Sequence, residues 1–194
     1  MKKLFLGLAI VTALCIPSFG AGYFEAGCNL TSVNVEGFAK GSGIGYQAGF
    51  WAGNDNIDIG IRLINRRYNM HILGAGLNLN TIQIELEPRV KLIHSYLTNG
   101  EITVFVGGYV GLTLDSSVSL DYLGYNAKLF NNNEIERLPH TGLTAGFIAE
   151  NDGIKTTIQY QHSTHDGTPD NLLNSFSVLG SIGFDLSPTT GKMY

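Results

Sequence analysis

The chain has 194 residues and a formal net charge of −4, with 12 basic against 16 acidic side chains. This balance lacks the basic excess that nucleic-acid binding needs, so we expect no nucleic acid among the partners. Charged residues make up only 14% of the chain, against about 25% in ordinary soluble domains. After the first twenty residues no segment is apolar for long enough to be a membrane helix, so any membrane-spanning part must be built from strands.

Residues 1–20 are typical of a secretory signal peptide. Lys2 and Lys3 follow Met1, a short apolar run comes next, and small residues stand at Ser18 and Gly20. We predict cleavage after Gly20, which leaves residues 21–194 as one exported domain. A lipoprotein signal through Cys15 is the alternative, and an uncleaved anchor would need about 20 apolar residues.

The exported part alternates between apolar and polar side chains, which is the period of a β-strand. Pro88 interrupts the apolar face of one such segment, and because proline removes a ladder donor we expect a bulge or weakened pairing there. We predict eight strands, near residues 23–32, 44–50, 57–63, 82–92, 102–114, 141–149, 154–161 and 175–186.

The links between these strands alternate in length. Short links fall at 52–56, 97–101 and 151–153, and long links fall at 35–42, 67–76, 116–140 and 164–174. An up-and-down meander then has all its short turns at one end and all its long loops at the other, as outer-membrane barrels do. We therefore predict an all-β fold, an eight-stranded antiparallel up-and-down transmembrane β-barrel.

The polar face decides which side of the strands is inside. It consists mostly of Gly, Ser and Thr, which suit a crowded lumen, and its few charges must then pair there. The alternative is a soluble periplasmic lipocalin-like binder with the same charges on a solvated surface. Aromatic residues near strand ends could form interfacial girdles: Tyr23, Phe24, Phe50, Trp51, Tyr96, Phe147, Tyr160, Phe176 and Phe184. The predicted interior polar network is Glu25, Arg62, Glu85, Glu87, Arg89 and Lys155.

In strand number, loop asymmetry and polar interior, residues 22–186 resemble the small eight-stranded outer-membrane barrels of the OmpA/OmpX type. The resemblance implies a monomer in the outer membrane of a diderm bacterium, in contact with outer-membrane lipids and lipopolysaccharide. It also implies a role in surface interaction or envelope integrity through external loops, without a cofactor. Exposed aromatic groups in the loop 116–140 indicate a possible external protein partner.

The segment 161–167 resembles the H-x-S-N segment of the outer-membrane lipid A 3-O-deacylases. That resemblance implies His162 as general base and Thr164, in place of serine, as nucleophile, with Asp170 as a candidate acid. The alternative, which we favour, is a non-catalytic cluster of histidine and hydroxyl groups at the outer rim. A metal site is not expected, because His162 and His165 point to opposite faces of a strand.

Overall fold

The computed structural model describes residues 21–35, 39–72, 75–98, 100–122, 125–131, 139–165 and 173–186. In these ranges the chain forms strands joined by turns, and no helix in this part is long and apolar enough to cross a membrane. The strands are β1 (Ala21–Val35), β2 (Ala39–Gly53), β3 (Ile57–Ile72), β4 (Ala75–Leu97), β5 (Gly100–Tyr122), β6 (Tyr125–Asn131), β7 (Pro139–Asn151), β8 (Ile154–His165) and β9 (Leu173–Asp185).

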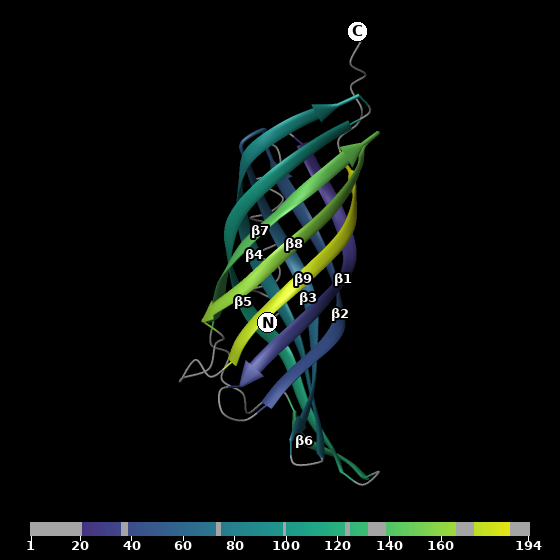
Figure 1. Cartoon of the computed structure of the whole chain (residues 1–194), viewed down its shortest axis with the longest axis vertical. Coiled ribbons are helices and arrows are strands. Elements are labelled where there is room, and N and C mark those ends of the chain that lie inside the picture. Colours follow the sequence, from purple (N-terminus) through teal and green to yellow (C-terminus); the bar gives the residue numbers. More distant parts are fainter. Residues whose placement is uncertain are drawn as a thin grey trace, which may run out of the picture.

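The strands close into an antiparallel barrel (Figure 1). Each strand of the ring pairs with its neighbours in the order β4-β3-β2-β1-β9-β8-β7-β5, and the pairing of β4 with β5 closes the ring. The predicted eight-stranded barrel is therefore confirmed, with β6 as an additional strand that pairs with β5 outside the ring. We call the end that carries the β2–β3, β4–β5 and β7–β8 turns the short-turn end.

Alternate side chains point into the lumen and away from the barrel. Gln159 and Glu85 are buried, whereas Val104, Ile158 and Ile182 lie on the outward face with 36%, 44% and 52% of their surface exposed. The outward face is apolar because the period-two pattern puts its Val, Ile, Leu and Phe residues there.

The expected aromatic girdles need one correction. Tyr23 and Trp51 are buried in the lumen and stack on each other with ring centroids 6.3 Å apart. Because Phe24 and Phe50 occupy the outward face, their chain neighbours must point inward.

Proline does weaken one ladder as expected. Pro88 pairs with Ile59 on β3, but the β4–β5 register passes from Leu86–Val110 to Arg89–Gly107 with no pair at Glu87 or Pro88 in these two described strands. The β4–β5 register shifts at two other places, between Ile82 and Gln83 and between Lys91 and Ile93.

Strands β4 and β5 are the longest, with 23 residues each. A β-strand needs about 9–11 residues to cross a bilayer, and both strands are longer than that. Strand β5 pairs with β7 only as far as Leu112 and then continues to Tyr122, paired with β4 and β6. The loop predicted over 116–140 was therefore wrong as far as Asn131, because residues 116–122 and 125–131 continue the sheet. Figure 1 shows β6 beyond the end of the barrel opposite the β7–β8 turn.

Candidate functional site

Six charged side chains from three strands meet inside the barrel. We call them the lumenal charge cluster: Glu25 from β1, Arg62 and Arg66 from β3, and Glu85, Glu87 and Arg89 from β4. Each alternates with outward apolar residues on its strand, so the pleat alone turns it inward. All six are at most 4% exposed.

The ion pairs of the cluster form a chain. Arg62 Nη2 lies 2.9 Å from Glu85 Oε2 and also contacts Glu87. Arg66 Nη2 lies 2.7 Å from Glu85 Oε1, and Arg89 Nε lies 2.9 Å from Glu87 Oε1. The link from Arg89 to Glu25 is longer, at 3.7 Å. Three guanidinium groups thus face three carboxylates, and the cluster is neutral.

Two amides from β8 close the cluster from the opposite wall. Gln159 Nε2 donates to Glu87 Oε1 at 2.8 Å, while its Oε1 accepts from Arg89 Nη2 at 2.6 Å. Gln161 Nε2 donates to Glu85 Oε2 at 3.2 Å, and its Oε1 accepts from Arg66 Nη2 at 2.7 Å. Because each amide both donates and accepts, it satisfies opposite charges at once.

Aromatic rings cover Arg89. Its guanidinium carbon lies 3.2 Å from the centroid of the Trp51 ring and 4.5 Å from that of Phe105. A Cβ added at Gly60 would collide with the Trp51 ring, so glycine is needed there to accommodate the tryptophan. The small residues on the inward face therefore provide space for large ones.

At the height of the cluster, these buried side chains occupy the lumen of the described barrel. A buried charge is tolerable only when it is paired and hydrogen-bonded, and each member of the cluster has such a partner. The free energy of unfolding should therefore depend strongly on every partner, since removing one leaves another buried and uncompensated.

Lys155 lies apart from the rest of the predicted network. Its Nζ contacts Glu150 and lies 3.2 Å from Asp185 Oδ1, at the short-turn end. Lys91 Nζ is nearby, 3.0 Å from Asp58 Oδ1. These groups line a polar cavity of about 360 Å³ that opens at the mouth of the barrel.

The candidate catalytic residues are placed only in part. His162 lies opposite Phe176 on β9 and is half-buried. The exposed Thr164 hydroxyl donates to the Thr141 carbonyl at 3.2 Å and lies 3.3 Å from the Thr141 hydroxyl. Asp170 lies outside the described residues. The catalytic role of His162 and Thr164 stays a prediction.

No protein-family model and no curated protein matches the sequence. Among solved structures, Neisserial surface protein A is similar at a TM-score of 0.51 and 14% identity, over 86% of this chain and 97% of that one. The chain has the fold of the small eight-stranded outer-membrane barrels. Ail, the attachment invasion locus protein of Yersinia pestis, is similar at a TM-score of 0.48 and 11% identity, over 87% and 99% of the two chains. Ail has also been solved with the heparin analogue sucrose octasulfate.

Within this outer-membrane-type barrel, the sequence interpretation missed Arg66, Gln159 and Gln161 as members of the lumenal network. Arg66 follows Arg62 by four residues, so continuing the alternation past the predicted end of that strand would have found it. The two glutamines lie on the polar face of β8, but their hydrogen bonds depend on which strands meet across the lumen.

Proposed function

We propose that the chain is an integral outer-membrane barrel with a filled polar lumen, acting in surface interaction through the hairpin that extends beyond the ring. The observation that carries this proposal is the extension of β4, β5 and β6 past the last β5–β7 pair at Leu112. The outward apolar face supports placement in lipid, and the alternation of short turns with long hairpins supports an external location for the hairpin.

The extension offers a specific kind of contact. Strand β6 stands at the end of the strand order, and β5 is its one partner among the described strands. An edge strand presents unpaired backbone groups, so an extended segment of a partner protein can add to it. A small apolar cluster stiffens the base of the extension: Val33, Tyr68 and Met70, with Leu77 and Leu79 packed against it.

Cysteine labelling on intact cells tests the location of the hairpin. In a Cys28→Ser background, Asp121→Cys on the hairpin should react with a membrane-impermeant maleimide, while Asp152→Cys in the β7–β8 turn should react only after lysis. Both positions are exposed, so access through the membrane is the difference between them. Labelling of Asp152→Cys alone on intact cells would contradict the orientation.

Fractionation tests the membrane placement independently. The full chain should sediment with outer membranes and change its gel mobility on heating, as a closed barrel does when it unfolds. Recovery in the periplasmic fraction would favour the lipocalin-like alternative. Photo-crosslinking from Asp121 should then capture a surface protein, with Asp152 as the matched control position.

A further inference from the structure

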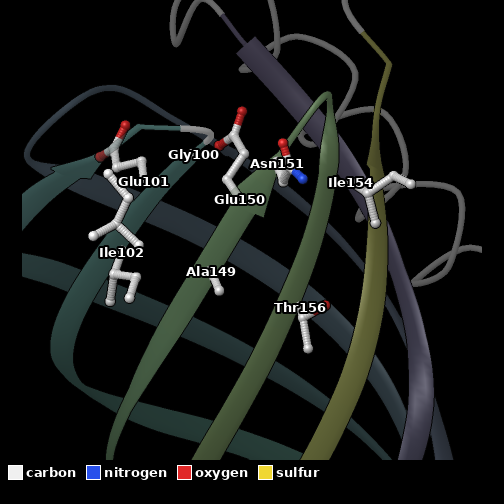
Figure 2. A pocket seen from close by; sticks show the side chains of 9 residues that line it. Gly100, Glu101, Ile102, Ala149, Glu150, Asn151, Ile154 and Thr156 are labelled. Carbon is white, nitrogen blue, oxygen red and sulfur yellow. The ribbon is translucent and has the colours of Figure 1, made fainter.

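A groove of about 400 Å³ lies on the outward face at the short-turn end, across β5, β7 and β8. Its floor is formed by Ile102, Ala149 and Thr156, and Ile154 stands at one side. Figure 2 shows Glu101 and Glu150 at the upper rim, above the level of Ala149 and Thr156. The volume is within the range of about 300–1,000 Å³ that small-molecule sites occupy.

The groove exists because one strand presents a small residue between two larger ones. Ala149 lies in register between Ile102 on β5 and Thr156 on β8. The preceding outward residue on β7 is Phe147, which is 40% exposed. Because the Ala149 methyl group is much smaller than the Phe147 ring two residues earlier on the same face, the surface is depressed at Ala149.

The rim of the groove carries two carboxylates, Glu101 and Glu150, which also line the polar cavity at the mouth of the barrel. Glu101 and Glu150 are directly opposite each other in the β5–β7 ladder, and like charges at such a pair are destabilising. His94 Nδ1 lies 2.6 Å from Glu101 Oε1, and Lys155 contacts Glu150. A further cation at this rim would reduce the remaining repulsion between the two carboxylates.

The apolar floor and the acidic rim together fit an amphiphile with a cationic head. We propose that the groove binds one aminophospholipid of the periplasmic leaflet, with its ammonium group at Glu101 and Glu150 and an acyl chain over Ala149. The inference rests on the proposed function, because the short-turn end faces the periplasm only if the barrel is oriented as proposed. An anionic phospholipid lacks the group that complements the two carboxylates.

Native mass spectrometry of the delipidated, refolded full chain tests this proposal. Phosphatidylethanolamine should bind as one copy about tenfold more tightly than phosphatidylglycerol with the same acyl chains, since one charge-assisted hydrogen bond distinguishes them. Ala149→Phe should abolish this tenfold preference by filling the groove. The double substitution Glu101→Gln with Glu150→Gln should abolish it by removing the two negative charges. Ala145→Phe, on the same face of β7 but outside the groove, should leave it unchanged.

Heat-dependent gel mobility shows whether each variant is folded, and Thr156→Phe provides a second way to fill the groove if Ala149→Phe does not fold. Equal binding of the two lipids, or a preference that persists in both filled variants, would overturn the groove proposal while leaving the proposed function intact. Capture of a protein at this rim instead of a lipid would overturn it as well. Failure of the wild type to fractionate with outer membranes would instead contradict the proposed function.

Discussion

At the scale of single residues, glycines on the two faces of the barrel should respond differently to substitution. Gly60→Ala should reduce the free energy of unfolding by about 1–3 kcal/mol, because the new methyl group would displace the buried Trp51 ring. Gly180→Ala is the matched control, since a Cβ there meets nothing within 4 Å. Denaturant titration in detergent micelles measures the free energy of unfolding of both variants. Equal losses in the two would show that the Trp51 ring moves aside freely.

Arg62 bridges two carboxylates of the lumenal charge cluster, Glu85 and Glu87. Arg62→Met should reduce the free energy of unfolding by about 3–5 kcal/mol, because Glu85 and Glu87 would each lose a buried partner. Lys91→Met should cost less, since that side chain is 16% exposed at the mouth. The same denaturant titration distinguishes the two variants. An unchanged free energy of unfolding in Arg62→Met would show that water replaces the guanidinium group.

His162 allows the esterase alternative to be tested directly. If His162 and Thr164 act on lipid A, cells with the wild-type chain should contain lipid A lacking one acyl chain, and His162→Ala should restore it. Mass spectrometry of extracted lipid A measures this, with His71→Ala as a control at an exposed histidine on β3. Identical lipid A with and without the protein would eliminate the esterase.

At the scale of elements, the hairpin should be separable from the barrel. Replacing residues 117–137 by a short turn removes pairs that β5 makes with β6 and with the tip of β4, but none that it makes with β7. Heat-dependent gel mobility should therefore be retained, while the truncated chain should no longer compete for the surface protein that is crosslinked to Asp121 of the full chain. A truncated chain that no longer folds would show that the hairpin nucleates the barrel.

The elements also show what the sequence could and could not predict. Strict alternation predicts all eight ring strands, but it weakens near Arg66 and beyond Leu114. The sequence therefore predicts loops where β3 and β5 continue. The alternation along each strand predicts which side chains point into the lumen. It does not predict how far along the barrel axis each of them lies. Lys155 was therefore grouped with the lumenal charges, whereas its register opposite Glu150 places it at the mouth.

At the scale of the whole molecule, the filled lumen predicts that the barrel does not conduct. Eight strands leave an interior only wide enough for side chains, and here Arg62, Arg89, Glu85 and Glu87 are all fully buried in it. The purified chain should show no porin-sized current in planar bilayers. Ion flux of that size through the wild type would mean that the ion pairs open in the membrane.

The charges of the lumenal cluster are distributed unequally between the two halves of the chain. All of them come from β1, β3 and β4, while β5, β8 and β9 contribute neutral groups such as Phe105, Gln159 and Ser181. The charges contributed by the amino-terminal half of the chain thus neutralise one another. The strands that close the ring add amides, aromatic rings and the His140 imidazole, which lies 3.4 Å from Glu85 Oε1, to a surface with no net charge.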